Sequence, residues 1–175
     1  MLLFEIDTKN PLRARLQKMV LAALFAAVAV LLSPFSFPLG PSKCLPFQHA
    51  VNGLAGVILG PFWACGAAFV SSLVRNTLGT GTLLAFPGSI FGALAVGFAA
   101  KLLPARLRFW AALAEPFATA TLGAGVAAFI ASPSGGWAGM YATLALAFLA
   151  SSGPGAILGC VLLRFLHSPA PQKTV

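Results

Sequence analysis

The chain has 175 residues, of which 59% are hydrophobic and only 8% are charged, and its mean hydropathy is +0.93. A soluble domain of this length needs a polar surface that this composition cannot supply, so the soluble classes are excluded. The formal net charge of +8 is explained by membrane topology and contact with anionic headgroups, and nucleic-acid binding is excluded as its cause.

Six apolar helices are predicted in chain order. The first ends at Ser33-Pro34, and a Pro/Gly-rich connection then runs to Pro46. Gly60-Pro61 divides the next apolar stretch into two helices, the first of which is short for a span of ~20 residues. The fold class is therefore an all-α membrane protein with six transmembrane helices in a single domain, residues 1–175. The helices are expected at about 14–32, 48–60, 62–78, 87–103, 109–130 and 138–165.

The basic residues give this bundle an orientation. Six spans place both termini on one side, and that side receives nine of the eleven basic residues. The opposite side receives only Lys43 and Arg75. Because short loops rich in Lys and Arg stay in the cytoplasm, both termini are predicted to be cytoplasmic. The clusters are Lys9, Arg13, Arg15 and Lys18, then Lys101, Arg106 and Arg108, then Arg164 and Lys173.

Small residues recur four positions apart and allow helices to approach closely in lipid. Most of these pairs are expected to pack the bundle itself, among them Gly88/Gly92, Gly135/Gly139 and Gly155/Gly159. In the first helix, two overlapping pairs form a flat stripe suited to docking another membrane helix, of this chain or of a partner. The stripe consists of Ala22, Ala23, Ala26 and Ala27.

Gln48, His49 and Asn52 open the second helix, and their spacing lets all three share one face. Polar side chains inside a membrane are costly unless they face a cavity or a partner. The three residues together predict a ligand site. The alternative is an interfacial cap wetted by headgroup water.

Arg75 and Asn76 end the third helix, and Thr80 and Thr82 follow in a loop with two glycines. Arg75 could simply snorkel outward. Against that, the outer side is the side that the topology keeps poor in cations, which favours a role in a site. The loop lacks the G-x-x-x-x-G-K-[ST] frame, so this chain is not expected to hydrolyse ATP by itself.

Glu115 is the only acid of the predicted membrane portion, and Pro116 after it disturbs the helix. A buried carboxylate is a functional candidate, and the alternative is a structural partner for Arg75 or His49. The predicted depth of Glu115, in the inner half, argues against a direct pair with Arg75. A protonated carboxyl group or a bond to the backbone is expected instead.

Trp137 and Tyr141 lie one turn apart at the outer mouth of the last helix. An aromatic belt explains them, although either ring could stack on a flat ligand. The sequence has no H-E-x-x-H motif, no G-x-S-x-G motif and no pair of carboxylates suited to share acid and base roles. Neither catalysis nor a metal site is therefore predicted.

Two segments carry a family resemblance: KCLPFQHAVN at 43–52 and the block RN…GTGTLLAFPGS at 75–89. They resemble the substrate-binding S components of energy-coupling factor (ECF) vitamin transporters. The ThiW branch, associated with uptake of the thiazole precursor of thiamine, is the most similar. The resemblance covers about 12–166, and its specific motifs cover about 42–89.

The resemblance implies a protein of the bacterial or archaeal plasma membrane that holds one vitamin-like molecule near its outer face, beneath the 33–47 loop. It also implies a transmembrane coupling subunit, to which the first-helix alanines would dock, and two ATP-binding-cassette ATPases. ATP would then be used by the partners, and this chain would need no cofactor.

The expected substrate is hydroxyethylthiazole, which is small, flat and neutral. Polar contacts are assigned to Gln48, His49, Asn52, Arg75 and Asn76, with Thr80, Thr82 and Glu115 as further members and Trp137 or Tyr141 for stacking. Thiamine, its pyrimidine precursor and a phosphorylated thiazole remain open as substrates. A membrane-embedded enzyme using His49 and Glu115, and a stand-alone channel or permease, are the alternatives of other classes.

Overall fold

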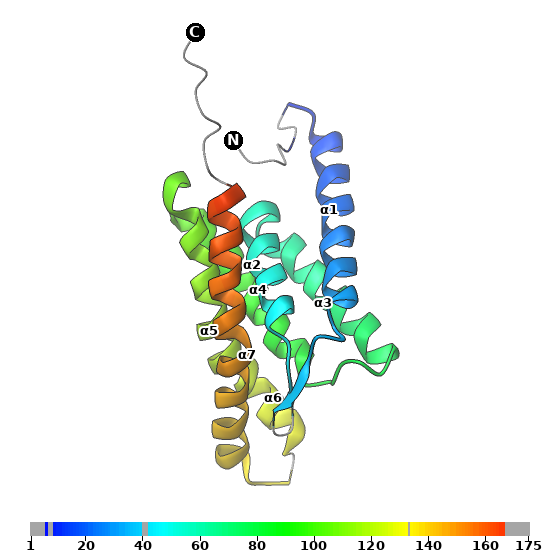
Figure 1. Ribbon diagram of the computed structural model, residues 1–175, viewed down its shortest axis with the longest axis vertical. Helices are drawn as coiled ribbons and strands as arrows, with labels where there is room; N and C mark the ends of the chain where they lie inside the picture. The colour runs from blue at the N-terminus through cyan, green and yellow to red at the C-terminus, as the bar shows by residue number, and fades with distance from the viewer. Residues whose placement is uncertain (1–5, 7–8, 40–41, 133, 167–175) are drawn as a thin grey trace.

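A computed structural model describes residues 6, 9–39, 42–132 and 134–166, which form a bundle of six helical segments (Figure 1). Each segment lies close to its predicted residues, and the fifth is continuous but changes its winding three times. Lys173, one of the basic residues from which the orientation was predicted, lies outside the described residues. The helices are α1 (Pro11–Leu31), α2 (Pro46–Leu59), α3 (Pro61–Thr77), α4 (Ala85–Leu102), the composite of η1 (Ala105–Leu113), α5 (Ala114–Ala118), η2 (Thr119–Gly123) and α6 (Ala124–Ala131), and α7 (Trp137–Leu166).

Local sequence sets the helix starts. The Asn10 side chain accepts hydrogen bonds from the backbone N–H groups of Leu12 and Arg13, at 3.1 and 3.2 Å, and so caps α1. α2 and α3 both begin with proline, which lacks the N–H group that would be unpaired at that position. Between them, Gly60 has φ +83°, a conformation that favours glycine and allows the sharp turn from α2 into α3.

The helices differ in their ability to cross a bilayer. Among the described residues, four have the length and composition to do so: α1, α4, the composite 105–131 and α7. α2 and α3 have only 14 and 17 residues, or ~21 and ~25 Å at the α-helical rise. Prolines at their starts and the Gly60 turn between them account for this shortness.

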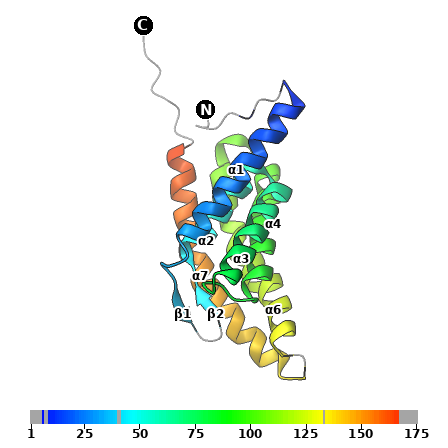
Figure 2. The same ribbon diagram turned by 90° about the vertical axis from the view of Figure 1, so that its right-hand side faces the viewer.

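A short antiparallel hairpin lies in the connection that was predicted to be a loop in an all-α fold. β1 (Phe37–Leu39) pairs with β2 (Ser42–Cys44) in the register Phe37↔Cys44 (Figure 2). Prolines exclude a helix here, and pairing satisfies backbone groups that a loose loop would leave to solvent. The hairpin is fixed to α7, because the Leu45 N–H donates to Ser151 Oγ at 2.7 Å.

α2 is the centre of the bundle and α1 is its periphery. Ten residues of α2 are buried, compared with three of the 21 residues of α1. Close helix approach around α2 depends on glycine, since a Cβ atom on Gly56 would lie 2.6 Å from Val96 Cγ1. The prediction that Gly135 and Gly139 pack the bundle is wrong: both are exposed, and a Cβ atom on either would meet no atom within 4 Å.

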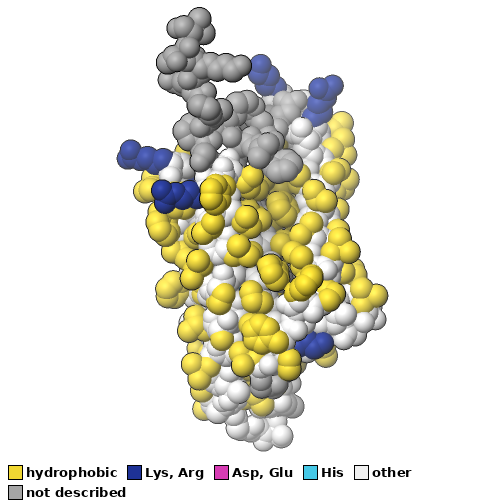
Figure 3. All heavy atoms as spheres, viewed as in Figure 1, with side chains coloured by type: hydrophobic (Ala, Val, Ile, Leu, Met, Phe, Trp, Pro, Cys, Tyr) yellow, Lys and Arg dark blue, Asp and Glu magenta, His cyan; other side chains and the backbone are white. Residues whose placement is uncertain are grey.

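The surface matches a membrane environment. Hydrophobic side chains cover the flank of the bundle seen in Figure 3, and Lys and Arg gather toward the end where α1 begins and α7 ends. The composition and the four long apolar helices indicate a membrane protein.

Candidate functional site

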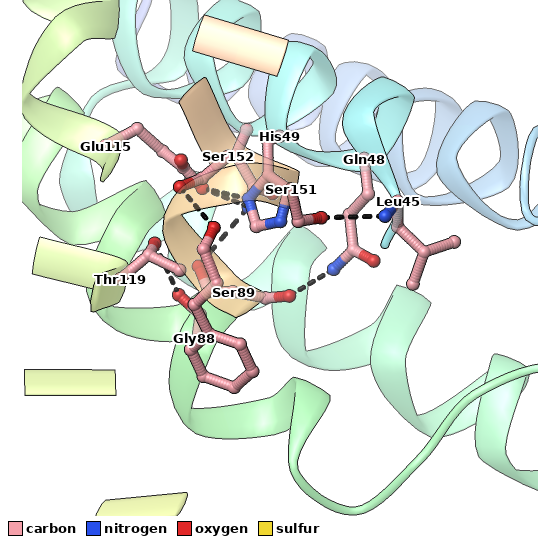
Figure 4. Close-up of polar contacts among 11 residues, drawn as sticks. Leu45, Gln48, His49, Gly88, Ser89, Glu115, Thr119, Ser151 and Ser152 are labelled. Carbon is pink, nitrogen blue, oxygen red and sulfur yellow. Dashed lines mark hydrogen bonds and ion pairs between the residues drawn. The ribbon is translucent and has the colours of Figure 1, made fainter. Parts of the chain in front are cut away.

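The polar residues that open α2 are buried against three other elements. Gln48, His49 and Asn52 contact α4 and α5, while Leu45 just before them contacts α7 (Figure 4). The structure therefore brings the predicted trio together in one cluster. The interfacial cap that was its alternative does not fit, because all three side chains are buried.

Glu115 lies at the centre of this cluster. Its Oε1 contacts His49 Nδ1 and accepts a hydrogen bond of 3.4 Å from Asn52 Nδ2, which also lies 3.5 Å from the carbonyl oxygen of Ser89. The carboxylate is fully buried, and its second oxygen, Oε2, has no hydrogen-bond partner among the described residues. A buried acceptor without a donor is costly, so Oε2 is suited to a ligand's hydroxyl group or to a water molecule.

The winding of the fifth helix explains how Glu115 reaches His49, and not Arg75 or the backbone. This helix was expected to begin at about residue 109. The helix instead begins at Ala105, and η1 is a 3-10 segment of nine residues, which rises ~2.0 Å per residue and places Glu115 ~20 Å from the helix start. The carboxylate thus reaches the first turn of α2 and pairs with His49 rather than with the backbone.

Hydroxyl groups complete the cluster. Gln48 Nε2 donates to Ser89 Oγ, and Thr119 Oγ1 donates to the carbonyl oxygen of Gly88 at 3.1 Å. Ser89 and Ser151 were not predicted as site residues. Ser151 had a detectable sequence signal, since two adjacent serines, Ser151 and Ser152, interrupt the otherwise apolar last helix.

Two glycines make room for the His49–Glu115 pair. A Cβ atom on Gly92 would lie 2.6 Å from Glu115 Oε1 and 2.6 Å from Thr119 Oγ1. A Cβ on Gly155 would lie 2.6 Å from the Cβ of His49. Backbone of α4 and α7 therefore faces the pair at a distance that only glycine permits.

A small cavity adjoins the cluster. Its volume is about 20 Å³, enough for roughly one ordered water. Phe148 is the one aromatic side chain on its wall among the described residues. The cavity is lined by Lys43, Leu45, Gln48, His49, Ala85, Gly88, Ser89, Thr119, Phe148 and Ser151.

Trp137 and Tyr141 lie away from this cavity. Their rings stack on each other, with centroids 5.3 Å apart and planes inclined by 13°. Tyr141 packs on a cluster that includes Ala124 and Leu144, and Trp137 is 46% exposed. Neither ring lines the cavity, so the structure gives no support to their predicted stacking on a ligand.

The residues of the 75–82 segment also lie outside the cavity wall. Asn76 Nδ2 donates to the carbonyl oxygens of Ser72 and Thr82, at 2.9 and 3.1 Å. Thr80 Oγ1 donates to the Arg75 carbonyl oxygen at 3.2 Å. These contacts build the turn between α3 and α4. Lys43 links it to the cavity, because its Nζ donates to the Thr80 carbonyl oxygen at 3.1 Å.

The first-helix alanines divide into two faces. Ala22 and Ala26 are buried in a core cluster with residues of α2, α3 and α4. Ala23 and Ala27 are exposed. An apolar groove of about 280 Å³ runs between α1 and α3 beside them, lined by Met19, Ala22, Ala23, Ala26, Trp63, Gly66, Ala67 and Val70.

The chain is similar to a known family of proteins. The family model described as thiamine-precursor transporter protein (ThiW) matches residues 19–169. No curated protein and no solved structure matches the chain. The matched range contains every residue of the polar cluster and most of the chain. The protein therefore belongs to the ThiW family of thiamine-precursor transporters.

Proposed function

We propose that this chain is the substrate-binding S component of an ECF-type transporter that takes up hydroxyethylthiazole, the thiazole precursor of thiamine. It acts as a multi-pass protein of a bacterial or archaeal plasma membrane, with six spans and both termini in the cytoplasm. The observation that carries the proposal is the buried His49–Glu115 pair beside a small cavity in a chain of the ThiW family.

The cluster matches the chemistry of a small, neutral heterocyclic alcohol. The free Oε2 of Glu115 can accept a hydrogen bond from the substrate's hydroxyl group. The ring nitrogen needs a donor, which the amide of Gln48 or the hydroxyl of Ser89 supplies, and Phe148 offers an apolar face to the ring. Cationic thiamine is less well matched, because the one described carboxylate already contacts His49.

Binding requires the site to enlarge. A cavity of about 20 Å³ holds a water molecule, whereas pockets for drug-sized ligands occupy ~300 Å³ or more. The substrate would displace the side chains that close the cavity from the hairpin end, Lys43 and Leu45. Arg75, Asn76, Thr80 and Thr82 act in this proposal by holding the turn to which Lys43 is bonded.

Energy would come from other subunits. The sequence has no phosphate-binding loop of the G-x-x-x-x-G-K-[ST] type. Two ATP-binding-cassette ATPases would use the ATP, and this chain would need no cofactor of its own. A transmembrane coupling subunit would dock on the exposed Ala23 and Ala27 of α1, where small side chains allow close helix approach.

Calorimetry with the purified protein in maltoside detergent tests the substrate. We expect hydroxyethylthiazole to bind, and thiamine and the pyrimidine precursor to bind at least tenfold more weakly. The variant His49→Ala should lose binding while its thermal unfolding remains cooperative. Preference for either control ligand, or unchanged affinity in His49→Ala, would refute the assignment.

Reconstitution tests the coupling. The protein in proteoliposomes should accumulate hydroxyethylthiazole only with the coupling subunit, the two ATPases and ATP. Uptake by the chain alone would establish the stand-alone permease instead, and chemical conversion of the bound ligand would establish an enzyme.

A further inference from the structure

Unpaired polar atoms in the interior gather on α3. Five buried side-chain nitrogen and oxygen atoms of the described residues have no hydrogen-bond partner. One is Oε2 of Glu115, and the other four are Ser72 Oγ and the Nε, Nη1 and Nη2 atoms of Arg75. Ser72 and Arg75 are three residues apart on α3, so their side chains share one face, and both are fully buried.

An unpaired arginine in this position needs a counter-ion. The guanidinium group keeps its charge in proteins and carries five N–H donors. Burial of such a charge without a partner is among the most costly arrangements in a protein. A folded state that retains Arg75 at zero exposure therefore implies an acceptor at the guanidinium group.

The chain itself supplies no such acceptor within the described residues. It has three acidic residues, Glu5, Asp7 and Glu115. Glu115 contacts His49 and Asn52, not Arg75. Glu5 and Asp7 lie outside the described residues and precede α1 in the sequence. The turn after α3 is bonded to the chain just beyond the C-terminal end of α1, where Ser33 Oγ donates to Thr80 Oγ1 at 3.3 Å.

The backbone of Arg75 is held firmly while its side chain is not. The N–H groups of Thr80 and Gly81 both donate to the Arg75 carbonyl oxygen at 2.9 Å. A Cβ atom on Gly81 would lie 3.2 Å from the Cβ of Arg75, so glycine lets the turn close over it. The turn thus fixes the backbone and the Cβ atom of Arg75 before any ligand arrives, which lowers the entropic cost of binding.

We propose that Arg75 and Ser72 form a binding site for an oxyanion. The planar guanidinium group can donate hydrogen bonds to two oxygens of a phosphate or carboxylate group. The Ser72 hydroxyl can donate a further hydrogen bond to one of the oxygens of the same group. The phosphate could belong to a phosphorylated precursor, to the free ion or to a lipid headgroup. The inference does not depend on the proposed thiazole specificity, because neither residue lines the cavity beside His49.

The test measures the thermal unfolding midpoint in phosphate-free buffer and maltoside detergent, with lipid removed. Three probes are added separately: inorganic phosphate, the phosphate monoester of hydroxyethylthiazole, and phosphatidylglycerol. We expect at least one to raise the midpoint of the wild type by about 5 °C at saturation. Arg75→Gln should not respond, whereas the matched control Arg106→Gln, at an exposed arginine, should respond as the wild type does.

The pattern of responses identifies the source of the oxyanion. A response to the monoester at tenfold lower concentration than to phosphate assigns it to the precursor. Equal responses assign it to the free ion, and a response to the lipid alone assigns it to a headgroup. The proposal is overturned if no probe shifts the midpoint, or if Arg75→Gln responds like the wild type.

Two further variants keep the test decisive if Arg75→Gln does not fold. Ser72→Ala leaves the guanidinium group in place, and Arg75→Lys replaces it with another positively charged donor. Each variant should require at least tenfold more of the active probe for the same shift in the midpoint. An unchanged dose response in both would also overturn the proposal. Hydroxyethylthiazole binding to the same variants reports on the His49–Glu115 site separately, so failure of one assignment is distinguishable from failure of the other.

Discussion

The side of the bundle formed by α2, α4, α5 and α7 differs from the side formed by α1 and α3 in what its small residues do. On the first side, Gly92 and Gly155 give space to the buried His49–Glu115 pair. On the second side, the alanines of α1 border an apolar groove. Small residues at similar spacing thus serve two purposes in one membrane protein. The purpose depends on whether a polar group or an apolar surface faces them.

The largest effect on ligand binding is expected when the Glu115 carboxyl group is removed. Replacing Glu115 with Ala should weaken hydroxyethylthiazole binding about 100-fold or more, because His49 and Asn52 lose their shared acceptor in a buried site. Calorimetry measures the affinity, and circular dichroism checks that the helices remain. Affinity within threefold of the wild type would remove Glu115 from the site.

Adding a single methyl group should have the next largest effect. Gly92→Ala places a Cβ atom 2.6 Å from both Glu115 Oε1 and Thr119 Oγ1, which forces the carboxylate away from His49. We expect binding to weaken about tenfold or more. Gly139→Ala is the matched control, because its Cβ meets no atom within 4 Å, and it should bind as the wild type does. Equal affinities would show that the pair tolerates displacement.

Substitutions at the neighbouring residues Ala26 and Ala27 of α1 should distinguish an effect on stability from an effect on coupling to the transport complex. Ala26→Leu overfills the core cluster and should lower the unfolding midpoint by several degrees, since overpacking costs ~1–3 kcal/mol. Ala27→Leu points outward and should leave the midpoint and ligand binding unchanged. Uptake by the reconstituted complex with its ATPases should nevertheless fall in Ala27→Leu. Normal uptake in that variant would move the docking surface elsewhere.

The smallest effect is expected at the start of α7. Trp137→Ala removes a ring that stacks on Tyr141 and is half exposed, so ligand affinity should change less than twofold. A matched variant at the cavity wall, Phe148→Ala, should weaken binding about tenfold. A larger loss in Trp137→Ala than in Phe148→Ala would restore the stacking role first predicted for the Trp137–Tyr141 pair.

Features that depend on local sequence were predictable. Proline and glycine define the ends of the helices, and the spacing of Gln48, His49 and Asn52 places them on one face. The membrane class follows from composition alone. Among the described residues Arg75 and Glu115 make no direct contact, which was also predicted.

Features that depend on packing between distant segments were not predictable. The 3-10 winding of η1 brings Glu115 to His49, 66 residues away, and no local pattern specifies it. The partners Ser89 and Ser151 come from two other helices, and the hairpin forms where prolines suggested only a loop. The resemblance identified the family correctly, but it did not place the individual side chains.

Cys44, at the end of β2, gives the hairpin a chemical reporter. Its thiol is 1% exposed and donates to the carbonyl oxygen of Ala150 on α7 at 3.8 Å. An alkylating reagent can reach the sulfur only when this strand lifts from α7. With Cys65 and Cys160 replaced by serine, the labelling rate of Cys44 would therefore measure how often the hairpin opens, and whether substrate slows or accelerates it.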